Sequence, residues 1–199
     1  FLIADEVGLG KTKVAQGVIE LATARRAGAN VLYVASSGHI VGQNLAKLRA
    51  GELKPETHGA LSELAALVYR EDVQGRLIGL TPIKDLRGDH FGSARERALL
   101  YRLLKFRHPT MMDQSGMLKF FGGRVNEDTF LTLTTKSSVS LGLSNEFESH
   151  LDDELIGKLA DPRQRDRHKR DIVGKLRAVL ARCALDKLNP ALVVVDEIQ

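Results

Sequence analysis

The 199-residue chain has no tryptophan, one cysteine and five prolines, and aromatic residues make up only 5% of it. The single cysteine, Cys183, excludes an intrachain disulfide and indicates a reducing compartment. No apolar run approaches the roughly 18 residues that a membrane-spanning helix requires, so we expect no membrane partner. The first residues lack the basic segment of a secretory signal peptide, and the expected location is therefore the cytoplasm.

Charged residues are present in both signs. Lys and Arg number 29 against 25 Asp and Glu, which gives a formal net charge of +4. This balance permits a polyanionic partner without requiring one. Hydrophobic residues make up 43% and charged residues 27%, which is an ordinary globular composition and excludes wholesale disorder.

Both ends of the chain fall in segments that should continue. The chain has no initiator Met and opens in the apolar run at residues 1–4, and it closes directly after another apolar run at residues 191–195. We expect the chain to be a fragment of a longer protein.

Strand and helix patterns alternate along the first part of the chain. Residues 1–4 and 31–35 are typical of buried strands, and helices are predicted from Lys13 onward and over 39–48. Strand, helix, strand and helix with tight turns predict a parallel α/β sheet. The first helix is expected to bury a stripe made of Val14, Val18, Leu21 and Ala22.

The rest of the chain reads as mainly helical. Helices are predicted over 61–69, from Ser93 onward, over 147–159 and from 172 to before Pro190, and strands over 76–80 and 191–195. Ser93 and Glu96 have the spacing of a capping box. Residues 129–140 are rich in Thr, Ser and Val and are expected to form a hairpin or an edge strand. Phe120 and Phe121 could stack on nucleic-acid bases, but they and Cys183 are expected in the core.

A glycine-rich turn between the first strand and the first helix has the context of a phosphate-binding loop. Its glycines allow successive backbone N–H groups to converge on one anion, and the helix start adds partial positive charge. Lys11 can reach the β- and γ-phosphates of a nucleotide, and the Thr12 hydroxyl can ligate Mg²⁺. The alternative is a plain turn with an incidental lysine. The predicted ATP-binding residues are Asp5, Glu6, Val7, Gly8, Leu9, Gly10, Lys11 and Thr12.

Two acids follow the last predicted strand. The carboxyl ends of parallel strands form the ligand edge of such a sheet. Asp196 can hold Mg²⁺ there through water, and Glu197 can orient or deprotonate an attacking water. The alternative is two solvated acids at a strand end.

These segments resemble superfamily 2 helicases and translocases. Residues 5–12 (DEVGLGKT) are similar to motif I of the Swi/Snf-like branch, notably of its bacterial members, where the leading Asp is usual. Residues 31–36 with Gln43 resemble motif Ia, and residues 193–199 resemble motif II, the DEAH-type box. Ile198 and Gln199 stand where that family usually has Ala or Gly and then His.

The resemblance implies a three-layer RecA-like domain that forms the ATP-binding half of a motor moving along nucleic acid, duplex DNA rather than RNA. It implies that Lys11 binds phosphate, that Thr12 and Asp196 hold Mg²⁺, and that Glu197 is the catalytic base. A second RecA-like domain of the same longer protein would supply an arginine, so we expect this chain alone to be a poor ATPase. In a bacterium the protein would be associated with the nucleoid.

The spacing of the two motifs predicts an insertion, because Lys11 and Asp196 lie 185 residues apart. We expect residues 1–84 to form the first part of the RecA-like domain, 85–171 a mainly helical insertion, and 172–199 the return helix and last strand. Residues 161–171 contain five Lys and Arg side chains, which could contact a phosphate backbone. They also contain three Asp, which favour a solvated helix start.

Two other functions remain open from the sequence. One is a protein-remodelling P-loop ATPase of the AAA+ type. The other is an ATP-sensing module that binds a protein partner such as RNA polymerase.

Overall fold

The computed structural model describes residues 10–49, 53–57, 61–70, 73–81 and 91–196. The chain divides into two compact units. Unit 1 comprises residues 1–59, 72–83 and 188–199, and unit 2 comprises residues 60–71 and 84–187. The predicted strand at residues 1–4 lies outside the described residues.

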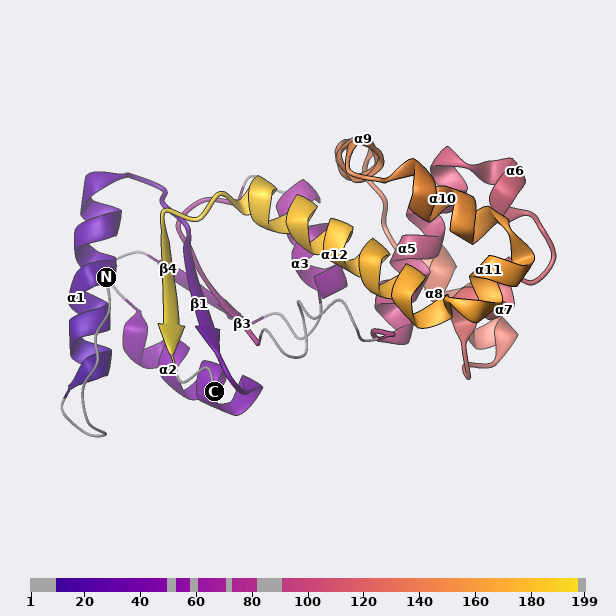
Figure 1. Cartoon of the computed structure of the whole chain (residues 1–199). Coiled ribbons are helices and arrows are strands. Elements are labelled where there is room, and N and C mark those ends of the chain that lie inside the picture. The colour runs from indigo at the N-terminus through magenta and orange to yellow at the C-terminus, as the bar shows by residue number, and fades with distance from the viewer. Residues whose placement is uncertain (1–9, 50–52, 58–60, 71–72, 82–90, 197–199) are drawn as a thin grey trace. The chain divides into compact units, whose positions relative to one another are not determined.

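Unit 1 is built on a parallel sheet (Figure 1). Its described strands are β1 (Val31–Ala35), β2 (Lys54–Thr57), β3 (Arg76–Leu80) and β4 (Leu192–Asp196), in the order β2-β3-β1-β4. Each neighbouring pair is parallel, and Val31 of β1 lies opposite Leu77 of β3 and Leu192 of β4. The predicted α/β fold with a parallel sheet is confirmed.

The strands follow from their composition, with one exception. All five residues of β1 are buried, as an unbroken apolar run in a parallel sheet predicts. The strands predicted at 31–35 and 76–80 have those bounds, and the last strand begins one residue later than predicted. β2 was not predicted, because its sequence Lys-Pro-Glu-Thr has little strand propensity. It forms an edge of the described sheet, where a proline is tolerated.

Two helices of unit 1 pack on one face of the sheet. Ile19 of α1 (Lys11–Arg25) and Val41 of α2 (Gly38–Leu48) belong to one buried cluster with Val31 and Tyr33, which alternate along β1 and therefore share a face. A Cβ at Gly79 of β3 would collide with side chains of α2, so this glycine permits the close approach of helix and sheet.

The apolar stripe predicted for α1 is wrong. Val14 and Leu21 are 45% and 62% exposed, whereas Ile19 is fully buried and Ala15 packs against the same cluster. Helix α1 carries apolar residues around much of its circumference. Periodicity alone therefore could not choose which of two adjacent stripes faces the sheet.

All of the regular secondary structure in the described part of unit 2 is helical. Its helices are α3 (Leu61–Arg70), α5 (Ala94–Arg107), α6 (Pro109–Met112), α7 (Met117–Gly122), α8 (Glu127–Lys136), α9 (Leu141–Ser149), α10 (Asp153–Ala160), α11 (Pro162–Arg167) and α12 (Lys169–Leu188). The capping box of Ser93 and Glu96 at the start of α5 is confirmed. Phe120, Phe121 and Cys183 are buried, as predicted.

The predicted hairpin or edge strand at residues 129–140 is wrong, because α8 occupies most of this segment. Asn126 caps the helix by accepting hydrogen bonds from the backbone N–H groups of Asp128 and Thr129. Phe130 and Thr134, one helical turn apart, are both buried. Capping and a buried helical stripe outweigh the strand propensity of the threonines.

The single helix predicted over 147–159 is two helices. The chain leaves α9 at His150, and Asp152 caps α10 with a hydrogen bond from the N–H of Glu154. The four-residue apolar period continues across this break, since Phe147 and Leu155 are both buried. A period in the sequence therefore did not reveal the change of direction.

The units also divide the chain differently from the predicted segments. Helix α3 and α12 as far as Lys187 belong to unit 2 rather than to the sheet unit. The reason is packing: α3 contacts α5 and α9, and the Tyr69 hydroxyl of α3 donates to the Cys183 carbonyl of α12 at 3.2 Å.

Candidate nucleotide-binding site

The start of α1 is shaped by a glycine. Gly10 adopts a left-handed conformation, with φ of 88°, and its carbonyl accepts hydrogen bonds from the N–H groups of Lys13 and Val14 at 2.8 and 3.2 Å. Among the described residues, no side chain caps this helix. The N–H groups and the dipole at a helix start of this kind can bind an anion such as a phosphate group.

Lys11 and Thr12 are the first two residues of α1, and both are partly buried. This position brings the Lys11 charge and the Thr12 hydroxyl to the same helix start as the backbone N–H groups. The other predicted nucleotide-binding residues, Asp5, Glu6, Val7, Gly8 and Leu9, lie outside the described residues, as does Glu197.

The carboxylate of Asp196 is held by two neutral donors. Tyr33 of β1 donates its hydroxyl to Oδ2 of Asp196 at 2.6 Å. The side-chain amide of Asn44 in α2 donates to the Tyr33 hydroxyl oxygen at 2.8 Å and to the same Oδ2 at 3.2 Å. Both hydrogen bonds end on Oδ2, so they hold this oxygen in place and restrict the orientation of the carboxylate.

Three elements reach the same end of unit 1 as the carboxyl ends of the strands. Asp196 ends β4 and lies in register with Ala35, the last residue of β1. Figure 1 shows the beginning of α1 at the same end of unit 1 as the carboxyl ends of β1 and β4. The fold therefore brings Lys11, Thr12 and Asp196 to one edge, where ligands of open parallel sheets bind.

The oxygen donors at this edge suit magnesium. Mg²⁺ in nucleotide sites commonly takes one or two protein oxygens and fills its remaining positions with water and phosphate. A threonine hydroxyl and a carboxylate already oriented by neighbours match that donor set. Within the described residues, no three His, Cys, Asp or Glu side chains gather as a metal cage.

Sequence reasoning missed Tyr33 and Asn44. Both lie in segments that were recognised, one in the strand at 31–35 and one in the following helix. Tyr33 is 1% exposed, yet it carries a hydroxyl into an otherwise apolar strand, and a buried hydroxyl needs a partner. That requirement was the available signal for Tyr33, but it could not identify the partner, because Asp196 lies 163 residues away along the chain.

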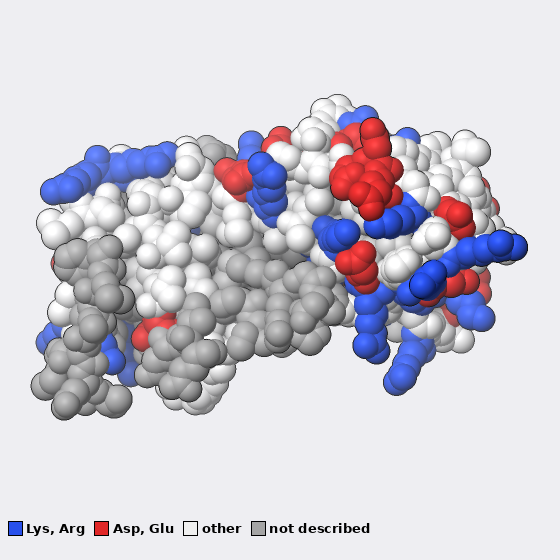
Figure 2. Space-filling view, viewed as in Figure 1, with Lys and Arg blue, Asp and Glu red and all other residues white. Residues whose placement is uncertain are grey.

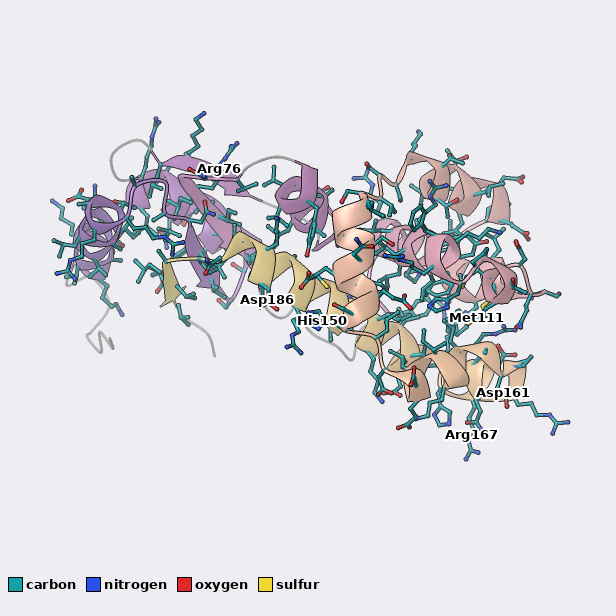
Figure 3. The ribbon with its side chains drawn as sticks, turned by 90° about the horizontal axis from the view of Figure 1, so that it is seen from above. Arg76, Met111, His150, Asp161, Arg167 and Asp186 are labelled. Atoms are coloured by element: carbon teal, nitrogen blue, oxygen red, sulfur yellow. The ribbon has the colours of Figure 1, made fainter. Side chains whose placement is uncertain are left out.

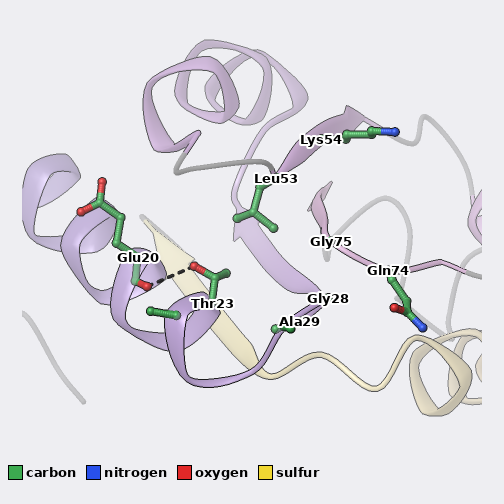
Figure 4. A pocket seen from close by; sticks show the side chains of 10 residues that line it. Glu20, Thr23, Gly28, Ala29, Leu53, Lys54, Gln74 and Gly75 are labelled. Carbon is green, nitrogen blue, oxygen red and sulfur yellow. Dashed lines mark hydrogen bonds between the residues drawn. The ribbon is translucent and has the colours of Figure 1, made fainter.

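Unit 1 also has a pocket of about 600 Å³ away from this edge (Figure 4). It lies where α1 ends and where β2 and β3 begin, whereas the candidate site lies where α1 begins and where the strands end. Its lining is mostly small or apolar, and a hydrogen bond from the Thr23 hydroxyl to the Glu20 carbonyl crosses its wall. The two charged side chains in its lining, Glu20 and Lys54, lie apart from each other in Figure 4, and we assign the pocket no ligand.

No family model, curated protein or solved structure matches the chain. Among the described residues, no helix combines the length and the apolar character needed to cross a membrane.

Proposed function

We propose that unit 1 is the ATP-binding half of an ATP-dependent motor that moves along nucleic acid, with duplex DNA as its track. In this proposal unit 1 is a three-layer RecA-like domain. One observation carries it: the Gly10-Lys11-Thr12 start of α1 and the oriented carboxylate of Asp196 share the carboxyl edge of a parallel sheet. The likeness of residues 5–12 to motif I of Swi/Snf-like proteins then selects the class of motor.

In this function the residues of unit 1 bind and orient the nucleotide. The N–H groups at the start of α1 and the Lys11 ammonium group hold the phosphates. Thr12 and Asp196 hold Mg²⁺, which when bound neutralises charge on the phosphate oxygens. The hydrogen bonds from Tyr33 and Asn44 keep the Asp196 side chain in one conformation, so that it needs little rearrangement when the nucleotide binds.

Hydrolysis would proceed by in-line attack of water on the γ-phosphate. Glu197 orients that water and accepts its proton, and Lys11 stabilises the charge that develops on the phosphate oxygens. An arginine from a second RecA-like domain completes the stabilisation. Without that domain, this chain would bind ATP and turn it over slowly.

The test is ATP hydrolysis by the natural protein with no nucleic acid, with duplex DNA, with single-stranded DNA and with RNA. The proposal predicts strong stimulation by duplex DNA and its loss in both Lys11→Ala and Glu197→Gln. Turnover that ignores every nucleic acid would overturn it and favour a protein-remodelling ATPase. Binding of Mg·ATP without turnover would favour an ATP-sensing module.

A further inference from the structure

A lysine in unit 2 lies close to two aromatic rings. Lys169, the first residue of α12, places its Nζ 5.1 Å from the ring centre of Phe91 and 5.2 Å from that of Phe120. It makes no salt bridge with any described residue. The rings attract the ammonium group through its charge, and it donates no hydrogen bond to any described residue.

A second cation lies close to the same ring. The guanidinium of Arg97 lies 4.4 Å from the centre of Phe91, and Arg97 is 6% exposed. Its hydrogen bonds go to backbone carbonyls only: to Phe121 at 2.6 Å, to Gly92 at 2.6 Å and to Gly122 at 3.1 Å. Carbonyl oxygens satisfy the donors of Arg97 without cancelling its charge, and the carboxylate of Glu96 offsets part of that charge.

The positive charges near Lys169 act on one another. Burial is the main cause that lowers the pKa of Lys169, and the neighbouring charges of Arg97 and Lys119 lower it further, while Asp166 acts in the opposite sense. Lys119 in α7 is exposed and makes no ion pair with any described residue. Lys119 directly precedes Phe120, whose ring lies 5.2 Å from the Lys169 ammonium group, so an anion near both lysines would reduce this repulsion.

The composition around these lysines also favours an anion. All of the net charge of the chain belongs to unit 2, where Lys and Arg number 21 against 17 Asp and Glu. Figure 2 shows Lys and Arg side chains projecting from the part of unit 2 that holds α11 and the beginning of α12, with acidic side chains between them. Arg167 points away from the helices at the end of α11 (Figure 3), and Arg170 is also exposed.

We propose that Lys119 and Lys169 form a phosphate-binding site on unit 2 that contacts the backbone of nucleic acid. The two ammonium groups supply donors of the right charge, and the aromatic rings fix one of them in position. Of the nearby arginines, Arg163, Arg167 and Arg170 are exposed and add positive charge to the surface, beside the exposed acids Asp161 and Asp166. The choice of nucleic acid as the source of the phosphate rests on the proposed function, whereas the arrangement of the cations does not.

The experiment measures binding of duplex DNA by the natural protein without ATP, over about 50 to 200 mM salt. The test variant is Lys119→Gln with Lys169→Gln. The control variant is Lys105→Gln with Lys158→Gln, which removes the same total charge from unit 2 but takes lysines that are paired with Asp113 and Glu154. The test variant should bind about tenfold more weakly, and the slope of log K against log salt should fall by about two.

Three results would overturn the site. The first is equal weakening of DNA binding in the test and control variants, and the second is no weakening in the test variant. The third is displacement of the DNA by millimolar inorganic phosphate, with the same salt slope in the test variant as in the natural protein. Lys119→Gln alone, at an exposed residue, should lower the slope by about one and guards against misfolding of the double variant. ATP hydrolysis without nucleic acid should be unchanged in every variant. A loss of DNA binding with normal basal hydrolysis therefore separates this site from the nucleotide site.

Discussion

The two units of the chain use charge in different ways. In unit 1 eight Lys and Arg balance eight Asp and Glu, and Asp196 lies at the sheet edge, held by neutral donors. In unit 2 charged side chains are part of the core, where Glu96, Arg97, Arg165 and Arg177 are all less than 10% exposed. Unit 1 thus keeps a carboxylate where a ligand can reach it, while unit 2 uses buried charge to join its helices.

The largest expected effect concerns the buried ion pair of unit 2. Glu96 of α5 and Arg177 of α12 are 3.3 Å apart, and their side chains are 4% and 2% exposed. Glu96→Ala leaves the Arg177 charge buried without this partner and should lower the free energy of unfolding of unit 2 by about 3 to 5 kcal/mol. Chemical denaturation followed by circular dichroism measures this change.

Glu63→Ala is the matched control for that variant. Glu63 pairs with Arg95 in the same unit, but the two side chains are 45% and 72% exposed. This loss should cost less than about 1 kcal/mol, because solvent screens the pair. Equal costs for the two variants would mean that the buried pair does not hold the helices together.

The next effect concerns the Asp196 carboxylate of unit 1. Tyr33→Phe removes the hydroxyl that donates to Asp196 and should raise the Mg²⁺ concentration for half-maximal ATP hydrolysis about tenfold. Tyr101→Phe, which removes a hydroxyl from unit 2, should leave that concentration unchanged. If Tyr33→Phe lowers only the stability and leaves the Mg²⁺ dependence as it was, Tyr33 has no part in orienting Asp196.

A smaller effect depends on pH. Burial raises the pKa of the Cys183 thiol to about 12, above its ordinary value of 9.0. The folded thiol stays neutral while the unfolded one ionises, so unit 2 should lose stability as the pH rises from about 9 towards 12, by about 1 kcal/mol at pH 10. Denaturation at pH 8 and pH 10 measures this loss. Cys183→Ala should lessen it, and an undiminished loss in that variant would place the titrating group elsewhere.

The smallest effect tests whether residues 127–136 form a helix. Thr132 is exposed in the middle of α8. Alanine has the higher helix propensity, so Thr132→Ala should stabilise unit 2 by about 0.5 kcal/mol in thermal denaturation. In a strand the same change would destabilise, so the sign of the shift decides between the two structures.

How well the sequence predicted each part depended on whether the signal was local. The apolar run of β1, the glycine of the α1 start and the capping box of α5 act within a few residues, and each was predicted. The position of Asp196 at the end of a strand was predictable for the same reason. The hydrogen-bond donors to that carboxylate were not predictable, because Tyr33 and Asn44 reach it only through the register of β1 with β4 and the packing of α2.

In unit 2, local signals in the sequence were less reliable guides to the structure. Residues 129–140 misled because threonine favours strands in general, whereas Asn126 and the buried Phe130 favour a helix in this place. The buried arginines were unpredictable from composition, since an arginine in a charged segment is usually exposed. Arg165 lies in the segment that was expected to be a solvated helix start, yet it is 4% exposed.

Titration of ATP into the chain, with and without Mg²⁺, tests most directly whether the edge of the sheet binds a nucleotide. Lys11→Ala should weaken binding about tenfold or more, and Asp196→Asn should remove the gain that Mg²⁺ provides. Lys13→Ala is the control, because Lys13 lies exposed two residues along the same helix. Binding that depends on Lys11 and Asp196 but not on Lys13 is the predicted result. Binding that is equally strong in all four proteins, or absent from the unaltered chain, would contradict a nucleotide site at this edge.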